Sequence, residues 1–336
     1  MRRLRLSRLR MHVPRAGFAA AAVLIVAGLG QTSDAQTSYL DNGTIRIGID
    51  LSRGGAISYL SRSGTSDNVV NVYDLGRHIQ QSYYSGPQPF VPPGATQHPA
   101  YSGWGWNPVQ AGDVYGYRSR VLQWSNDGIT LYVKCVPKQW ALNNVDSECT
   151  MEMWITLDQN RAHVHNRLTN SRSDLTQYSA RSQELPAVYV IGRLYNLYTY
   201  TGSLPFAAKP LTRIVNSGPP WQSWNATEHW AALVNDVNWG LGVYHPGATS
   251  MVGGFRGTPG TGGPYSSNTG YIAPVRQEIL DYDIVYEYDY TLILGTLEEI
   301  RACVYAHRPD LRPNHFFGRD RQHWYYVGAQ DDGLAH

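Results

Sequence analysis

Short segments in which apolar and polar residues alternate recur along most of the chain. In 44–50, Ile45, Ile47 and Ile49 alternate with polar or small residues, which is the pattern of a β-strand with one buried face. The pair Asp127-Gly128 separates two such segments and is typical of a hairpin turn. Further strand-like segments span 116–123, 129–136, 150–157, 162–169, 230–234, 240–244 and 284–294.

One segment has the pattern of a helix instead. Thr296 and Glu299 have the spacing of a capping box, and Ile300 and Val304 fall on one helical face. Many short strands with a single helix favour an all-β fold. We therefore expect an antiparallel β-sandwich or supersandwich with long loops and one short helix near 296–308.

The composition is that of a folded protein without a nucleic-acid surface. Hydrophobic residues make up 42% of the chain and charged residues 16%, which excludes a disordered chain. Six of the 28 basic residues lie within the first 15 positions, and in the rest of the chain acidic residues outnumber basic ones. No basic stripe remains, so we expect no nucleic-acid partner.

The N-terminal segment has the pattern of an export signal. Residues 1–16 are rich in arginine, and an apolar run spans 17–30. This run is shorter than the ~20 residues that cross a bilayer. Ser33 and Ala35 are small residues at the positions that a signal peptidase reads, so we expect 1–35 to be a signal peptide. The remaining 36–336 is then a single secreted or periplasmic domain, with no membrane partner after cleavage.

The cysteines fit an oxidising compartment. Cys135 and Cys149 flank a segment centred on Asn143 and Asn144, which we interpret as a hairpin loop. They are therefore expected to form a disulfide, with two free buried thiols as the alternative. No Cys/His spacing is typical of a metal site and no cofactor-binding motif occurs, so we expect neither a metal nor a cofactor.

Two parts of the chain resemble a known superfamily. The N-terminal motifs are NGTIRIGIDLSRGGAISYL and SGTSDNVVNVYDLGR, and a later one is HVHNRLTNSRSD. They resemble galactose-mutarotase-like β-supersandwich domains, over roughly the first half of the expected mature chain. The superfamily includes sugar epimerases and domains of glycoside hydrolases and polysaccharide lyases.

The resemblance implies a concave sugar site at the residues that follow the last motif. In this chain they are ARSQELPAVY, residues 180–189. The epimerases place a histidine in that stretch, whereas this chain has Arg181 and Glu184. This departure argues against epimerase chemistry.

Carboxyl groups are the candidates for catalysis. Hydrolysis of a glycosidic bond needs two of them, an acid with a raised pKa and a base or nucleophile. Glu184 lies in a mostly apolar strand, within the sequence RSQEL. Glu278 lies in a similar short sequence, RQEI. Asp113 in a Trp-containing loop is a further partner. The alternative is that each carboxylate forms a structural ion pair.

Aromatic rings on loops are candidates for sugar binding, because the C–H faces of sugars pack on them. Three Gly/Pro-rich segments, 83–108, 214–227 and 253–271, are expected to be such loops. The alternative is that part of the aromatic residues belong to the core. Together with nearby polar side chains, the expected substrate-binding residues are Arg77, His78, Tyr83, Tyr84, Trp104, Trp106, Asn107, Gln110, Arg181, Glu228, His229 and His245.

These patterns together indicate a secreted carbohydrate-active enzyme. We expect a glycoside hydrolase that acts on a polysaccharide or oligosaccharide by carboxylate acid/base catalysis. One alternative is a polysaccharide lyase that acts on a uronate-containing polymer through His, Tyr and Arg side chains. Another is a non-catalytic carbohydrate-binding protein, for which the chain is long.

Overall fold

The computed structural model describes residues 37–307, 315–319 and 324–329. The expected signal peptide, 1–35, lies outside the described residues. All described residues belong to one compact unit, Asp34–His336. Within them, no helix has both the length and the apolar character needed to cross a membrane.

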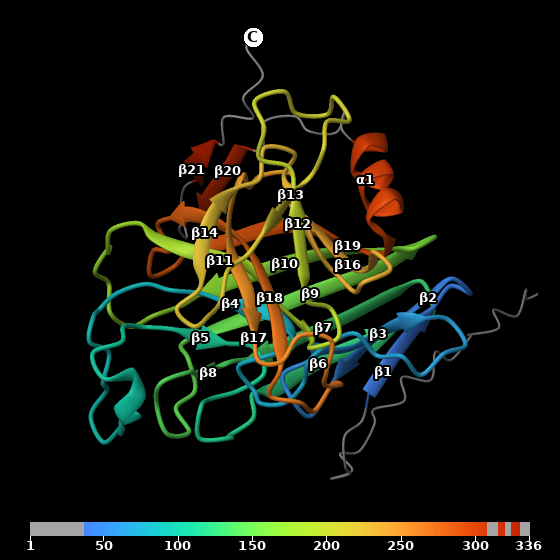
Figure 1. Cartoon of the computed structure of the whole chain (residues 1–336). Coiled ribbons are helices and arrows are strands. Elements are labelled where there is room, and N and C mark those ends of the chain that lie inside the picture. The colour runs from blue at the N-terminus through green and yellow to red at the C-terminus, as the bar shows by residue number, and fades with distance from the viewer. Residues whose placement is uncertain (1–36, 308–314, 320–323, 330–336) are drawn as a thin grey trace, which may run out of the picture. The chain divides into compact units, whose positions relative to one another are not determined.

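Two large antiparallel sheets form the framework (Figure 1). In the first sheet the strands follow the order β1 (Thr37–Asp41), β2 (Ile45–Asp50), β3 (Ala56–Arg62), β4 (Ile79–Ser82), β11 (Arg181–Ile191), β18 (Thr269–Glu278), β17 (Ser250–Arg256) and β14 (Gln222–Asn225). Two short strands, β5 (Pro108–Val109) and β8 (Lys138–Gln139), extend it beside β4.

The second sheet has nine strands. Their order is β13 (Thr212–Ile214), β12 (Asn196–Thr199), β15 (Trp230–Val234), β16 (Trp239–Tyr244), β19 (Val285–Thr296), β10 (Arg161–Asn170), β9 (Cys149–Asp158), β7 (Thr130–Val136) and β6 (Arg120–Asn126). The remaining elements are a separate hairpin of β20 (His315–Arg319) and β21 (Trp324–Ala329), the 3-10 helix η1 (Pro99–Tyr101) and the helix α1 (Leu297–Ala306).

The all-β antiparallel fold expected from the sequence is confirmed, as is the position of its helix. Strand β10 has strictly alternating buried residues, because successive side chains point to opposite faces of a sheet. Its buried side chains, such as Val164 and Leu168, join isoleucines of β2 and methionines of β9 in one core. That core lies between the two sheets.

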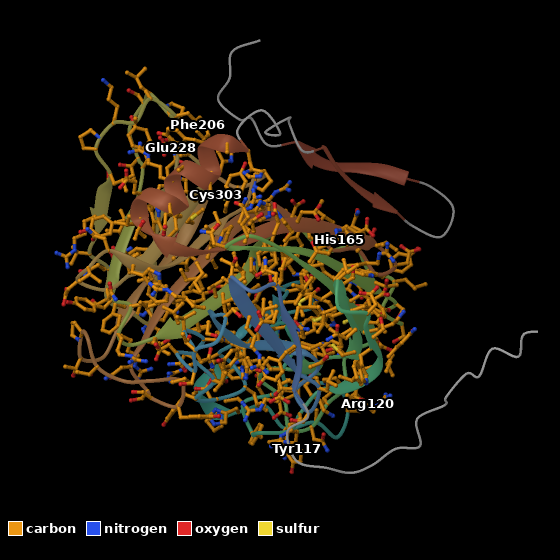
Figure 2. All side chains as sticks on the ribbon, turned by 90° about the vertical axis from the view of Figure 1, so that its right-hand side faces the viewer. Tyr117, Arg120, His165, Phe206, Glu228 and Cys303 are labelled. Atoms are coloured by element: carbon orange, nitrogen blue, oxygen red, sulfur yellow. The ribbon has the colours of Figure 1, made fainter. Side chains whose placement is uncertain are left out.

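Helix α1 packs against the second sheet through the face predicted from the sequence. Thr296 accepts a hydrogen bond from the Glu299 amide, and the Glu299 side chain accepts one from the Thr296 amide, which completes the capping box. Ile300 and Val304 are buried against side chains of β15, β16 and β19. Figure 2 shows Glu228 beside this helix, which is a contact described below.

The expected disulfide is not present. Strands β7 and β9 are neighbours, as the hairpin interpretation requires, but the residue opposite Cys135 is Met151. Cys149 lies two positions further along β9, opposite Asn170 of β10. Both cysteines are free, buried thiols. Strand register therefore placed the two sulfur atoms diagonally rather than directly across from each other.

Candidate functional site

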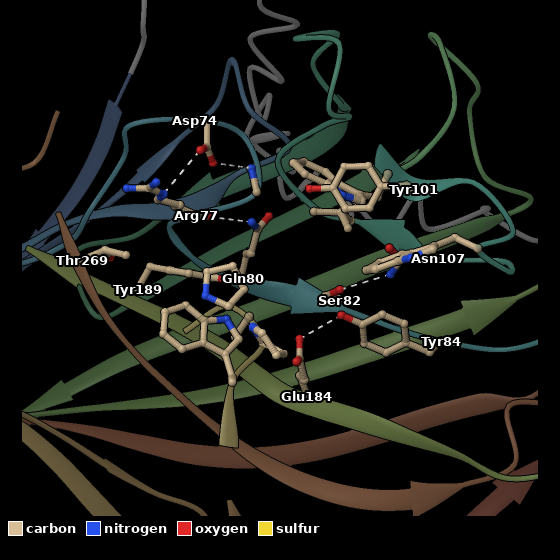
Figure 3. Close-up of a pocket in the computed structure, with 18 of the residues that line it drawn as sticks. Asp74, Arg77, Gln80, Ser82, Tyr84, Tyr101, Asn107, Glu184, Tyr189 and Thr269 are labelled. Carbon is tan, nitrogen blue, oxygen red and sulfur yellow. Dashed lines mark hydrogen bonds and ion pairs between the residues drawn. The ribbon is translucent and has the colours of Figure 1, made fainter. Parts of the chain in front are cut away.

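A pocket of about 560 Å³ opens on the first sheet, over β4 and β11. The long loops on either side of these strands form its walls, and Figure 3 shows their side chains converging on it. Its lining consists of Asp74, Gly76, Arg77, Gln80, Ser82, Tyr84, Tyr101, Trp104, Asn107, Val109, Trp140, Glu184, Ala187, Tyr189, Pro219, Pro220, Trp221, Arg256 and Thr269.

A bulge in β11 shapes the floor of this pocket. Glu184 lies opposite Ser82 of β4, whereas Ala187 lies opposite Gln80, so β11 has one extra residue over this stretch. In a regular strand, positions 184 and 187 would point to opposite faces. The extra residue brings Ala187 to the same face as Glu184, and both line the pocket.

Glu184 is half-buried in the pocket floor. The Tyr84 hydroxyl donates a hydrogen bond of 2.9 Å to its Oε2 atom. Burial raises the pKa of Glu184, and hydrogen bonding with Tyr84 and Tyr271 acts in the opposite direction. A carboxyl group with these properties retains its proton to a higher pH than an exposed glutamate does.

Aromatic rings stand on two sides of Glu184. On one side the Tyr101 and Trp104 rings meet edge to face with centroids 4.8 Å apart. The Trp140 ring lies 5.7 Å from Tyr101. On the other side Tyr189 and Trp221 both contact the buried Tyr271, with centroid distances of 4.3 Å and 5.1 Å. The pocket thus presents flat apolar surfaces at both walls.

An ion pair lies across the pocket from Glu184 (Figure 3). The Arg77 Nε atom is 3.3 Å from the Asp74 Oδ2 atom. Arg77 also donates from Nη1 to the carbonyl oxygens of Ser266 and Ser267, at 3.0 Å and 3.1 Å. The guanidinium of Arg77 is therefore held by several partners, while about half of the Asp74 carboxylate is exposed.

A second, smaller pocket of about 220 Å³ adjoins the first. The two share Tyr84, Trp104 and Asn107 as lining residues. Arg181 and Trp106 also line the smaller pocket. The shared residues make the two pockets one continuous recess along the sheet, which we call the groove.

The structure brings seven of the predicted site residues to the groove and leaves the others outside. Those at the groove are Glu184, Arg77, Tyr84, Trp104, Trp106, Asn107 and Arg181. Of the two tryptophans, Trp104 is 38% exposed and Trp106 only 1%, so Trp106 is mainly a core residue.

The two expected carboxylate partners of Glu184 lie elsewhere. In the pairing of β11 with β18, Glu184 is opposite Val275 and Arg181 is opposite Glu278. Since 275 and 278 differ by an odd number, Glu278 points to the other face of the sheet. There it is buried, with its Oε1 atom 2.7 Å from a nitrogen of Arg276.

Asp113 is an anchor for loops. Its carboxylate accepts hydrogen bonds from the backbone amides of Tyr115, Tyr117 and Asn144. Burial raises its pKa, and these backbone hydrogen bonds act against that rise. It does not line the groove, so the expected grouping of Glu184, Glu278 and Asp113 is not formed.

The predicted residues Tyr83, Gln110 and His78 are buried beneath the groove. The Tyr83 hydroxyl donates to the Gln81 side chain at 2.8 Å. The Gln110 side chain accepts a hydrogen bond from the Gln81 backbone amide and donates one to the Gly54 carbonyl oxygen. Burial and the neighbouring Arg53 lower the pKa of His78 to about 3, so this ring is neutral.

Glu228, His229 and His245 lie away from the groove. The Glu228 carboxylate accepts from Arg301 and Tyr305 of α1, at 3.0 Å and 2.6 Å, and it also accepts from the Trp230 indole. His229 and His245 are buried, and the His245 amide donates to the His229 carbonyl oxygen at 3.1 Å. Through its hydrogen bonds Glu228 joins α1 to Trp230 of β15 in the second sheet.

Several groove residues were absent from the predicted set. Tyr101 belongs to the same Gly/Pro-rich segment as Trp104, and that segment was the signal that could have included it. Trp140, Tyr189 and Arg256 come from separate parts of the chain, and only the fold brings them to the groove. In the part of the chain that the structure describes, no group of three His, Cys, Asp or Glu side chains is arranged to hold a metal ion.

No protein-family model matches the chain, and no curated protein matches it. Among solved structures, it is similar to a putative aldose 1-epimerase from Escherichia coli K12, with 10% identity and a TM-score of 0.48, over 79% of this chain and 100% of the other. A putative mutarotase from Salmonella typhimurium is 12% identical, with a TM-score of 0.44, over 79% and 92% of the two chains. A GH36 alpha-galactosidase from Geobacillus stearothermophilus is 8% identical, with a TM-score of 0.45, over 79% and 42%.

Proposed function

We propose that this protein is a carbohydrate-active enzyme that binds a glycan in the groove and hydrolyses a glycosidic bond, with Glu184 as the proton donor. The observation that carries the proposal is the position of Glu184. It is a half-buried carboxyl group with a raised pKa, and it opens into a pocket with aromatic walls. A protonated carboxyl group at such a position is what a general acid requires.

The lining of the pocket supports a sugar as the ligand. Sugar rings pack their C–H faces on aromatic rings, and their hydroxyls need polar partners. Trp104, Tyr101 and Trp221 supply rings, while the exposed side chains of Asp74 and Arg256 supply polar groups. The volume of about 560 Å³ is within the usual range for ligand pockets.

Hydrolysis needs a second carboxylate, and Asp74 is the one that lines the same pocket. In Figure 3 it stands across the pocket from Glu184, with Gln80 between them. In the proposed reaction Glu184 gives its proton to the oxygen of the leaving sugar as the glycosidic bond breaks. A water molecule adds to the anomeric carbon and gives a proton to Asp74.

The proposal includes export of the protein. The arginine-rich and apolar segment within 1–35 supports secretion or release into the periplasm. The substrate is then an extracellular polysaccharide or one of its fragments.

A lyase is the second candidate, because the groove holds a tyrosine and arginines. Elimination at a uronate needs a cation next to the carboxylate, and a base and an acid at the sugar ring. The Tyr84 hydroxyl in contact with Glu184 offers such a proton-transfer pair. Arg181 and Arg256, which line the groove, offer the cations.

The test is incubation of the protein with a panel of neutral and acidic polysaccharides. New reducing ends without ultraviolet absorbance from an unsaturated product support hydrolysis, whereas new ends with that absorbance support the lyase. Binding without either signal would leave only a binding protein.

Glu184→Gln keeps the shape of the side chain and removes its proton. We expect turnover to fall by about 10²–10⁴-fold while glycan binding remains. Glu298→Gln is the matched control, because Glu298 is an exposed glutamate on α1 outside the groove. If Glu184→Gln keeps most of the activity, Glu184 is not the proton donor.

A further inference from the structure

A buried side-chain amide takes the place of a strand neighbour beside the pocket. Strand β4 pairs with β11 up to Ser82, which lies opposite Glu184. In a continued ladder, Tyr84 would lie opposite Ser182. Instead, the Tyr84 amide donates to the Gln183 Oε1 atom at 2.8 Å, and the Gln183 Nε2 atom donates to the Tyr84 carbonyl oxygen at 2.7 Å. The fully buried Gln183 side chain therefore satisfies both backbone groups of Tyr84.

The chain leaves β11 at this point because its next backbone groups bind elsewhere. The Tyr83 amide donates to the Pro108 carbonyl oxygen at 3.2 Å. The Nδ2 atom of the buried Asn107 donates to the Tyr83 carbonyl oxygen at 2.8 Å. Backbone groups without partners are rare inside folded proteins, and here Gln183 supplies the partners that β11 does not. The segment that carries Tyr84 is thus fixed on both sides.

The Tyr84 side chain connects this arrangement to Glu184. Tyr84 and Ser82 are two positions apart, so both side chains point to the pocket face, as Glu184 does. The Tyr84 hydroxyl donates to the Glu184 Oε2 atom at 2.9 Å (Figure 3). Gln183 precedes Glu184 in β11 and points to the other face of the sheet. A side chain beneath the sheet therefore acts on a carboxyl group in the pocket through Tyr84.

The hydrogen bond from Tyr84 distinguishes the two oxygens of Glu184. A protonated carboxyl group has one hydroxyl oxygen and one carbonyl oxygen. The carbonyl oxygen is the better acceptor, so a donor at the Oε2 atom favours the form in which the Oε1 atom carries the proton. The Oε1 atom is then the one from which a proton is transferred.

Other titratable or charged groups also face Glu184. They are Tyr271 of β18, Tyr189 of β11, Arg256 of β17 and, across the pocket, Asp74 and Arg77 of the segment before β4. All of them remain in the variants described below. A change in the titration of Glu184 in those variants therefore reports the loss of the bond from Tyr84.

We propose that Gln183 and Tyr84 are positioning residues for the reaction in this pocket. Gln183 holds the backbone of Tyr84, and the Tyr84 hydroxyl holds Glu184 with its transferable proton on the Oε1 atom. The proposal rests on the proposed function, since it assigns both residues a role in the same hydrolysis.

The first experiment needs no substrate. The isotope-labelled carboxyl carbon of Glu184 is titrated by NMR in the full chain, and Glu184→Gln identifies its resonance. Tyr84→Phe keeps the ring and removes the donor, so the ionised form loses a hydrogen bond and the pKa of Glu184 rises. Gln183→Met keeps the length of the side chain and removes both of its bonds to Tyr84, so it should shift the titration in the same direction.

The double variant tests whether Gln183 acts through Tyr84. Once Tyr84→Phe has removed the hydroxyl, Gln183→Met should add no further shift to the titration of Glu184. Gln183→Asn, an amide too short to make both bonds, takes its place if Gln183→Met does not fold. Thermal unfolding shows which variants are folded.

Two matched controls lie outside the groove. Tyr132→Phe removes a hydroxyl that donates to another glutamate, Glu152, at 2.7 Å. Asn68→Leu removes a buried amide that bonds to backbone groups of β3. Both variants should leave the titration of Glu184 unchanged.

The second experiment uses a polysaccharide of the panel that the wild type hydrolyses. Tyr84→Phe should lower kcat about tenfold, the worth of one hydrogen bond, while KM stays within about twofold. The alkaline limb of the profile of kcat/KM against pH should move to higher pH, because Glu184 then keeps its proton longer.

The possible failures are distinguishable. If neither single variant shifts the titration of Glu184, the positioning proposal is overturned and the proposed hydrolysis stands. If Gln183→Met shifts it further in the double variant, Gln183 does not act through Tyr84 and its assigned role is overturned. If the titrations shift as expected but no polysaccharide of the panel is hydrolysed, the proposed function is overturned, and with it the role of both residues in catalysis.

Discussion

At the scale of the residue, Trp104 and Trp106 have opposite surroundings although one residue separates them. Trp104 stands at the edge of the groove against the rings of Tyr101 and Tyr84. Trp106 is enclosed, and its ring lies near the guanidinium of Arg172. The sequence context, SGWGWNP, is nearly the same for both. Exposure rather than local sequence therefore assigns them different roles.

Replacement of the two tryptophans is expected to separate binding from stability. Trp104→Ala should weaken glycan binding and change the free energy of unfolding little. Trp106→Ala should lower that free energy by about 3–5 kcal/mol, because it removes a buried aromatic side chain. Calorimetric affinity and urea unfolding measure the two effects. A large loss of stability in Trp104→Ala would show that its ring belongs to the core.

At the scale of the element, α1 depends on one glutamate outside the helix. The Glu228 side chain is fully buried, and it accepts hydrogen bonds from two side chains of α1 and from the backbone amide of Phe206. Burying a carboxylate costs free energy unless hydrogen-bond donors and a cation replace the water that it loses, so this contact depends on all of its donors. The local capping box predicts that the helix forms, but Glu228 fixes where it packs.

Glu228→Gln is expected to lower the free energy of unfolding by about 3–5 kcal/mol, because Arg301 loses its buried charge partner. Glu298→Gln on the same helix should change it by less than about 0.5 kcal/mol. Chemical denaturation measures both. The folded fraction of Glu228→Gln should bind glycans as the wild type does. If Glu228→Gln is as stable as the wild type but no longer binds glycans, Glu228 belongs to the substrate site instead.

At the scale of the whole molecule, buried histidines couple stability to pH. Burial together with Arg276 and His229 lowers the pKa of His245 to about 3, and His78 is lowered to about 3 as well. Between 6.5 and these values, the unfolded chain takes up protons that the folded chain does not. The contribution of both histidines to the free energy of unfolding is therefore present above pH 6.5 and is lost as the pH falls towards 3. Glu184 has the opposite effect: because its pKa is raised in the folded chain, its contribution to the free energy of unfolding increases as the pH falls.

Removal of one of these histidines should flatten the acid side of the stability curve. His245→Asn retains an acceptor for the Gly247 amide but cannot be protonated. We expect the slope of unfolding free energy against pH, between about pH 6 and 4, to fall by up to about 1.4 kcal/mol per pH unit. Urea unfolding at several pH values measures it. His98 accepts from the Ala100 amide in the same way, so His98→Asn is the matched control for the loss of the acceptor. An unchanged slope in His245→Asn would contradict the prediction.

The sequence by itself determined the features that depend on neighbouring residues. Alternation in 44–50 and 162–169 predicted strands, because successive side chains of a strand point to opposite faces. The capping box at Thr296 predicted the helix, because its two hydrogen bonds join residues three positions apart. Glu184 was recognised as a candidate because its neighbours in the strand are apolar.

Only the tertiary structure decided which residues accompany Glu184. The parity of the β11–β18 register turns Glu278 to the other face, and the bulge after Glu184 brings Ala187 and Tyr189 to the groove. Asp74, and not Asp113, lines the pocket with Glu184, because residues of the segment before β4 reach the pocket whereas Asp113 is held by backbone amides. Register, bulges and loop packing depend on residues far apart along the chain, and so no local pattern reports them.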